Sequence, residues 1–175
     1  MRTLTLIRHA KSSWDDPTLD DMIRPLNHRG IENTTLLGNY LFNQKFIADK
    51  IISSPATRAL HTAINIGDWI GYPHKKINIS NVLYFGKVSQ VIEDIHHLKD
   101  KFYNVCLVGH EPLLGNLAEY LCGVAPEKFV TCGILTIQFE GVLWREIKKY
   151  AGKSTSFITP KYVHTLQQNI LQEHG

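Results

Sequence analysis

The sequence is poor in the features that mark exported, membrane or metal-binding proteins. It has only three cysteines in 175 residues: Cys106, Cys122 and Cys132. Their number is odd and no C-x-x-C spacing occurs, so neither a disulfide framework nor a cysteine zinc site is expected, and we predict reduced thiols in a cytoplasmic protein. No apolar run approaches the length of a membrane span, and no signal-peptide pattern precedes Arg8. We therefore expect no membrane as a partner.

Charge and motif content narrow the possible functions further. The formal net charge is only +3, and lysines and arginines form no cluster interleaved with aromatic residues, so nucleic acid is not expected as a partner. The chain has no G-x-x-x-x-G-K-[ST] loop, no H-E-x-x-H motif and no carboxylate cluster with metal-ligand spacing. Routes that depend on a bound metal are therefore not supported, and we expect no cofactor.

The dominant pattern in the chain is an alternation of strand-like and helix-like segments. Strands are expected at residues 3–7, 49–54, 77–80 and 104–110, and helices at 31–44, 56–71, 89–102 and 113–123. Such alternation is typical of an α/β domain in which helices flank a mainly parallel central sheet. The length of 175 residues suits one domain with a substantial core.

The C-terminal part departs from this alternation. Residues 133–150 are expected to form two strands joined at Glu140-Gly141, a hairpin that adds an antiparallel edge to the sheet. The remaining segment, residues 153–175, is polar and has one weak helical pattern, so we expect a weakly structured tail. The sequence thus predicts one domain over residues 1–152 and a C-terminal tail after it.

Cationic side chains follow three of the predicted strands. Arg8 and His9 follow the first strand. Arg58 lies shortly after the second, and His110 stands at the end of the strand that begins at Asn104. Ligands of open α/β sheets bind outside the carboxyl ends of the strands, so these side chains are expected to share one pocket. Gathered cations repel one another unless an anion joins them, and guanidinium groups match the oxygens of a phosphoryl group, so the sequence predicts a phosphate site.

Three segments around these cations resemble a known family. "RHAKSSW" at 8–14, "SSPATRALHTA" at 53–63 and "VGHEP" at 108–112 are similar to the hallmark segments of the histidine phosphatase, or phosphoglycerate mutase-like, superfamily. "IRPLNHRG" at 23–30 narrows the resemblance towards the SixA-like phosphohistidine phosphatases. The resemblance spans roughly residues 3–150, and the three segments together are far more specific than any one of them.

The resemblance implies a fold and a set of residue roles. The fold is a phosphoglycerate mutase-like three-layer sandwich, and the activity is that of a two-step phosphatase. By the family pattern His9 is the nucleophile, while Arg8, Arg58 and His110 surround the phosphoryl group. Arg24 is similar to an arginine that enters the pocket from the following loop, and a structural role in that loop is the alternative for it.

The chemistry of these residue types agrees with such roles. A neutral imidazole is a good nucleophile near pH 7, so His9 needs only a fixed tautomer and a clear line to phosphorus. The transferring phosphoryl group spreads negative charge over its oxygens, and Arg8, Arg58 and a protonated His110 would stabilise it by preorganised electrostatics. No metal is required for this route.

The proton donor is the point at which the sequence departs from the wider family. Mutases and many small-molecule phosphatases carry a glutamate after the third strand, but residues 82–89 read "VLYFGKVS" and contain no acid. A phosphohistidine leaves easily without a protein acid, so this departure points to cleavage of a phosphorus–nitrogen bond. Glu111 lies where another branch has its aspartate donor, and it could either donate a proton or cap the following helix.

The sequence therefore predicts a cytoplasmic phosphatase that removes phosphate from phosphohistidine in a protein. A first alternative is a small-molecule phosphomonoesterase that uses Glu111 as its acid. A second is a non-catalytic phosphoprotein-binding module, although a binding module has no use for the nucleophile His9. The expected partner is accordingly a phosphorylated protein or a small phosphorylated substrate.

Overall fold

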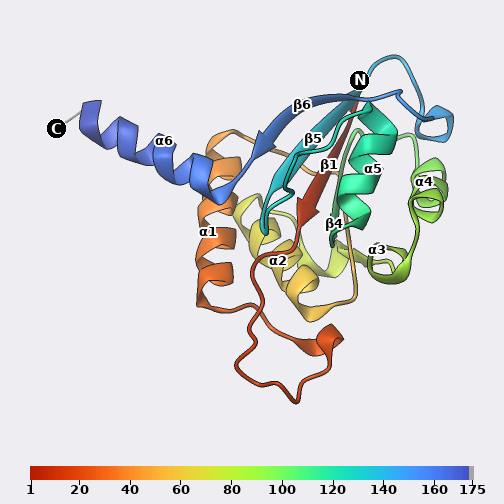
Figure 1. Ribbon diagram of the computed structural model, residues 1–175. Helices are drawn as coiled ribbons and strands as arrows, with labels where there is room; N and C mark the ends of the chain where they lie inside the picture. The colour runs from red at the N-terminus through yellow and green to blue at the C-terminus, as the bar shows by residue number, and fades with distance from the viewer. Residues whose placement is uncertain (174–175) are drawn as a thin grey trace.

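The computed structural model, which describes residues 1–173, confirms the expected α/β sandwich (Figure 1). The strands are β1 (Arg2–Arg8), β2 (Lys50–Ser53), β3 (Asn78–Ile79), β4 (Asn104–Gly109), β5 (Ile134–Phe139) and β6 (Lys153–Ile158). The helices are α1 (His28–Asn43), α2 (Thr57–Trp69), α3 (Val82–Phe85), α4 (Val88–His96), α5 (Leu113–Cys122) and α6 (Pro160–Glu173). Short 3-10 turns are η1 (Asp21–Ile23), η2 (His74–Lys76) and η3 (Trp144–Glu146).

The sheet is mixed: β3, β2, β4 and β1 run parallel, and β5 and β6 add antiparallel pairs on one side. Its strand order is β3-β2-β4-β1-β5-β6. The pairs β2–β3, β2–β4 and β1–β4 are parallel, whereas β1–β5 and β5–β6 are antiparallel. The carboxyl ends of β1, β2 and β4 therefore meet at one edge, which is the edge where the phosphate site is predicted.

Helices cover both faces of the sheet, and this explains why the central strands β1 and β4 carry apolar residues on both faces. In β1, Leu4 and Leu6 lie in the buried cluster formed with α4 and α5, whereas Ile7 lies in the cluster formed with α1 and α2. Alternate residues of a strand point to opposite faces, so a strand covered on both faces must be apolar in both registers. The result is a sandwich of three layers.

The expected hairpin at Glu140-Gly141 is wrong. β5 ends at Phe139, and its antiparallel partner β6 begins only at Lys153. The intervening chain packs into the core instead of continuing the ladder, because Trp144 is fully buried and its indole N–H donates a hydrogen bond to the carbonyl oxygen of Phe102 at 2.7 Å. The antiparallel edge itself is present, as predicted.

The expectation of a weakly structured tail is also wrong for residues 153–173. Residues 153–158 form β6, an edge strand in which polar side chains are tolerated because none of its positions is fully buried. Phe157 of this strand packs edge-on against Phe129, with ring centroids 5.3 Å apart. α6 follows, anchored by the buried Val163 near α1, and its distal part projects from the sheet (Figure 1). The division of domain and tail at residue 152 stays a prediction, and residues 174–175 lie outside the described part.

None of the helices within residues 1–173 combines the length and apolar content needed to cross a membrane.

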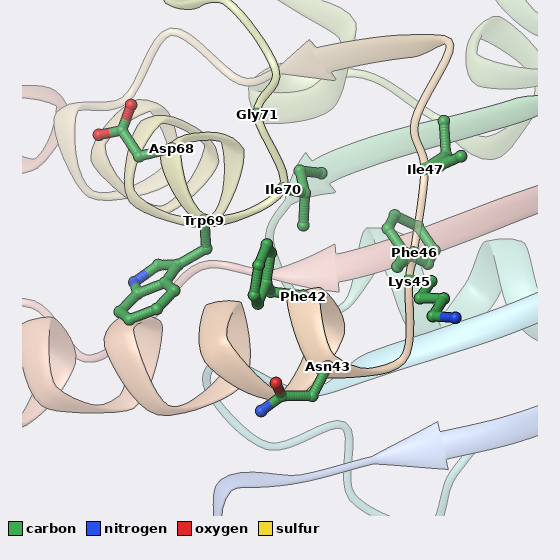
Figure 2. A pocket seen from close by; sticks show the side chains of 9 residues that line it. All are labelled: Phe42, Asn43, Lys45, Phe46, Ile47, Asp68, Trp69, Ile70 and Gly71. Carbon is green, nitrogen blue, oxygen red and sulfur yellow. The ribbon is translucent and has the colours of Figure 1, made fainter.

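A surface pocket lies between the C-terminal ends of α1 and α2. Its lining is largely apolar and includes Phe42, Phe46, Trp69 and Ile70 (Figure 2). Both helices run back from the carboxyl edge of the sheet, so their C-terminal ends lie at the opposite edge from His9. None of the predicted site residues lines this pocket, and it is therefore separate from the predicted phosphate site.

A close approach between α1 and the segment after β1 fixes the chain next to His9. Asn27 caps α1, since its side-chain oxygen accepts a hydrogen bond from the backbone N–H of Gly30 at 2.8 Å. The carbonyl oxygen of Lys11 accepts a hydrogen bond from the backbone N–H of Asn27 at 3.0 Å. A Cβ atom at Gly30 would lie 2.2 Å from that same carbonyl oxygen, so only glycine allows this contact.

Gly30→Ala is therefore expected to lower the free energy of unfolding by about 2 kcal/mol, the usual range for overpacking. Turnover should fall as well, because Lys11 is only two residues from His9. Urea unfolding measures the first effect. Gly67→Ala is the matched control, because its new Cβ would make its closest contact at 3.4 Å in a helix interior, and this variant should be neutral or more stable. Equal stability of the two variants would contradict the expectation.

Candidate active site

The His9 ring is held in one tautomer by the backbone. Its Nδ1 lies 2.7 Å from the carbonyl oxygen of Ala10. A carbonyl oxygen can only accept, so Nδ1 carries a proton, and in the neutral ring Nε2 keeps its lone pair. The backbone N–H of His9 donates to the carbonyl oxygen of Gly109 at 3.0 Å, which ties this position to the end of β4. Nε2 is thus the nitrogen available as a nucleophile.

His110 lies beside His9 and is held by two polar partners. The centroids of the two rings are 4.9 Å apart. Nε2 of His110 lies 2.8 Å from Oγ of Ser54, and Nδ1 lies 3.4 Å from Nη2 of Arg58. A guanidinium group can only donate, so Nδ1 is the acceptor and Nε2 donates its hydrogen to Ser54. The geometry therefore favours a neutral His110 ring in the free site.

Arg58 is buried in the first turn of α2, where its guanidinium group contacts both the backbone carbonyl and the side-chain carboxylate of Asp21. Its Nη1 donates to the carbonyl oxygen of Asp21 at 2.6 Å, and its Nη2 donates to Oδ2 of Asp21 at 2.8 Å. The hydroxyl of Tyr84 donates to the same Oδ2 at 2.6 Å. Tyr84 also packs edge-on against His110, with ring centroids 5.1 Å apart. These contacts join η1, α2, α3 and the end of β4 into one site.

Arg8 lies at the end of β1 and keeps a hydrogen-bond donor available for a ligand. Its Nη1 donates to the carbonyl oxygen of Phe129 at 2.6 Å. Its Nε is buried and has no hydrogen-bond partner among residues 1–173. A buried donor without a partner is costly, so an oxygen acceptor supplied by a ligand would relieve that cost. The structure thus brings Arg8, His9, Arg58 and His110 to one edge of the sheet, as predicted.

Burial and neighbouring charge lower the pKa values of both histidines. Burial is the main cause for His9, whose pKa falls to about 4, and the charges of Arg58 and Arg8 act in the same direction. Burial is again the main cause for His110, whose pKa falls to about 3. His110 is therefore expected to be neutral in the free protein, and the prediction of a protonated His110, which concerns the ring beside a bound phosphoryl group, stays a prediction. A phosphoryl group would favour the protonated rings.

These pKa values predict an unusual titration. In the free protein, followed by NMR, His9 should stay neutral down to about pH 4 rather than titrating near 6.5. An unfolded imidazole binds its proton near 6.5, so the unfolded chain binds more protons between about pH 6.5 and pH 4, and the free energy of unfolding should fall as the pH is lowered through this window. Saturating phosphate should raise both pKa values. Titration of His9 near 6.5 without phosphate would contradict this account.

Arg24 and Glu111 both lie close to the site. The Arg24 guanidinium stacks 3.5 Å from the centroid of the Trp14 ring, and its charge helps to lower the pKa of Asp21. Nε and Nη1 of Arg24 are buried without a hydrogen-bond partner among the described residues. The structure therefore supports a packing role for Arg24 and also leaves it free donors.

Glu111 caps α5, which is one of its two predicted roles. Its Oε1 accepts a hydrogen bond from the backbone N–H of Gly115 at 2.9 Å. Burial raises the pKa of this carboxyl group, while the bond from Gly115 and the charge of Arg8 oppose that rise. A raised pKa is also what a proton donor needs, so the geometry does not remove the second role.

Sequence reasoning missed Asp21 and Tyr84. Asp21 lies in the aspartate-rich stretch "WDDPTLDD", where no pattern singles out one carboxylate, and it meets Arg58 from 37 positions away. Tyr84 lies in "VLYFGKVS", a segment that was informative only for its lack of an acid. No group of three or more His, Cys, Asp or Glu side chains in the described part of the chain is placed to hold a metal ion.

Known proteins share this arrangement of sequence and fold. Residues 4–79 match the model of the histidine phosphatase superfamily (branch 1). An uncharacterized protein of Mycobacterium tuberculosis is 31% identical over 165 residues, covering 89% of this chain and all of that protein. The phosphohistidine phosphatase SixA of Escherichia coli is 28% identical over 137 residues, covering 77% of this chain and 84% of SixA.

A solved structure agrees with the sequence relatives. The protein histidine phosphatase SixA complexed with tungstate superposes with a TM-score of 0.79 and 25% identity, covering 91% of this chain and 97% of that one. The fold is thus the phosphoglycerate mutase-like sandwich that the resemblance implied. With its paired histidines and arginines at the carboxyl edge of the sheet, the chain belongs to the histidine phosphatase superfamily and is a SixA-like phosphatase.

Proposed function

We propose that this phosphatase removes phosphate from phosphohistidine side chains of proteins, through a phosphohistidine intermediate on His9 and without a metal. The observation that carries the proposal is the His9 tautomer. The hydrogen bond to Ala10 leaves the Nε2 lone pair free, beside cations that can hold a phosphoryl group. The similarity to SixA, a phosphohistidine phosphatase, supports the same substrate class.

The reaction takes two displacements at phosphorus. In the first, a bond forms between phosphorus and Nε2 of His9 while the bond from phosphorus to the substrate nitrogen breaks, and that nitrogen keeps the electron pair. In the second, the oxygen of water attacks phosphorus, the bond to Nε2 breaks with its electron pair left on Nε2, and inorganic phosphate departs with the protons of the water. Arg8, Arg58 and His110 stabilise the charge on the transferring group in both steps. With phosphate bound, His110 takes up a proton and becomes a further donor.

A cytoplasmic phosphorylated protein is the partner that we propose, with neither nucleic acid nor a membrane involved. The small-molecule phosphomonoesterase is the second candidate, and the observation that favours it is the raised pKa of Glu111. An alcohol leaving group needs a proton from such an acid, whereas a departing imidazole does not.

Glu111→Gln separates the two candidates. Glutamine keeps an oxygen that can accept the hydrogen bond from Gly115, so the helix cap should survive. For a phosphohistidine peptide we expect kcat to change only a few-fold. If phosphoserine is the true substrate class, its turnover should fall by about 10²- to 10⁴-fold, the usual contribution of a general acid.

Wild-type protein is compared on the phosphohistidine peptide, phosphoserine and p-nitrophenyl phosphate. We expect efficient turnover of the peptide and weak hydrolysis of phosphoserine. Glu119→Gln is the matched control, because Glu119 is exposed on α5, the helix that follows Glu111. Efficient phosphoserine hydrolysis that is selectively lost in Glu111→Gln would overturn the proposal.

A further inference from the structure

The Asp21 carboxylate is an unexpected group for a phosphate site. Its Oδ2 accepts hydrogen bonds from Arg58 and Tyr84, while Oδ1 has no hydrogen-bond partner within residues 1–173. The side chain is 52% exposed, whereas the side chain of Arg58 is only 9% exposed. The Asp21 carboxylate is therefore partly open to solvent beside the buried guanidinium group of Arg58.

A fixed negative charge at that position disfavours a simple phosphate dianion. Like charges repel, and a carboxylate beside Arg58 also competes with phosphate for the guanidinium donors. Asp15, Asp16 and Asp20 lie on the same loop, but they are exposed, so solvent screens their charges and Asp21 is the carboxylate that matters. The site is better matched to a phosphoryl group whose leaving group carries a positive charge.

A protonated phosphohistidine is such a group. One ring nitrogen carries the phosphoryl group and the other carries a proton, so the ring is cationic. When phosphorus passes to Nε2 of His9, the ring nitrogen that loses phosphorus keeps the electron pair. The proton on the other nitrogen remains in place, and neutral imidazole departs.

We infer that Asp21 is a specificity-determining residue that accepts a hydrogen bond from the protonated ring nitrogen of the phosphohistidine substrate. The inference rests on the proposed function and adds the residue that recognises the leaving group. A carboxylate that bonds the N–H of this ring favours the cationic form, which is the form that departs as neutral imidazole. An alcohol leaving group offers no such cation.

Several charged and titratable groups surround Asp21. They are Arg58 on α2, Tyr84 on α3, Arg24 beyond η1, and the rings of His9 and His110. The hydrogen bond from Tyr84 is the main cause that lowers the pKa of Asp21, and Arg58 adds to it. Asp21 is thus held ionised, which suits an acceptor and excludes a role as proton donor.

Asp21→Asn tests the inference, with kcat/KM measured on the phosphohistidine peptide and on p-nitrophenyl phosphate. The ratio of the first value to the second is expected to fall by about 10- to 100-fold, the effect of one charge-assisted hydrogen bond. In the pH profile of kcat for the peptide, the fall of kcat at high pH should also begin at a lower pH. Without the carboxylate, the phosphohistidine ring of the bound substrate loses its proton more readily. Asp20→Asn, an exposed neighbour, should leave the ratio unchanged within about two-fold.

The other outcomes overturn the inference in distinct ways. An equal loss of kcat/KM on both substrates, with no change in the pH profile of kcat, would mean that Asp21 only positions Arg58. An unchanged ratio would mean that it does not contact the leaving group. If the wild-type protein hydrolyses p-nitrophenyl phosphate but not the peptide, the proposed function itself fails, and the inference falls with it.

Discussion

Replacing His9 by alanine is expected to lower kcat/KM on the phosphohistidine peptide by at least on the order of 10⁴-fold, since the variant has no nucleophile. The structure leaves the Nε2 lone pair of His9 free and fixes the ring by its bond to Ala10. A steady-state assay of the purified variant measures the loss. Phosphate binding should persist, because Arg8 and Arg58 remain.

The fold of the His9→Ala protein should be preserved. The backbone at this position is held by hydrogen bonds that alanine also makes, including the one from its N–H to the carbonyl oxygen of Gly109. Circular dichroism and urea unfolding check this point. A folded His9→Ala protein with more than about a tenth of the wild-type activity would remove the two-step mechanism.

Arg58→Met is expected to lower kcat/KM by about 10³-fold or more, within the range measured for arginines that stabilise phosphoryl transfer. The substitution removes a cation from the site, and the negative charge of Asp21, which Arg58 no longer offsets, then opposes phosphate. Arg58→Lys keeps the charge but loses the paired donors, so its activity should lie between those of Arg58→Met and the wild type.

Arg145→Met is the matched control for Arg58→Met. Arg145 is exposed in η3 and pairs with Asp100, which precedes β4 and so lies away from the carboxyl edge of the sheet. This variant should keep wild-type kcat/KM within about two-fold. A comparable loss in both arginine variants, or a loss below ten-fold in folded Arg58→Met, would contradict the role assigned to Arg58.

The sequence was sufficient to predict the parts of this fold that follow simple periodicities. Central strands such as β1 and β4 have apolar residues on both faces because helices cover both faces. Once strands and helices alternate, the carboxyl ends of the parallel strands share an edge, so the meeting of His9 with His110 was predictable. These inferences need only local patterns and a topological rule.

The parts that could not be predicted depend on contacts between distant residues. Asp21 contacts Arg58 because of the course of the loop that carries it, and no periodic pattern in the sequence predicts that course. The C-terminal hairpin was misplaced because the burial of Trp144 competes with continued strand pairing. The neutral state of His110 depends on burial, which residue type alone does not reveal.

Transfer of phosphate from substrate to His9 is the step on which the whole account depends. The direct measurement mixes wild-type protein with a phosphohistidine protein carrying labelled phosphate, quenches under alkaline denaturing conditions within one turnover, and locates the label by peptide mass spectrometry. The account predicts label on the peptide that contains His9, and none in His9→Ala. Turnover at the normal rate with label on another residue, or with no labelled enzyme at any quench time, would contradict it.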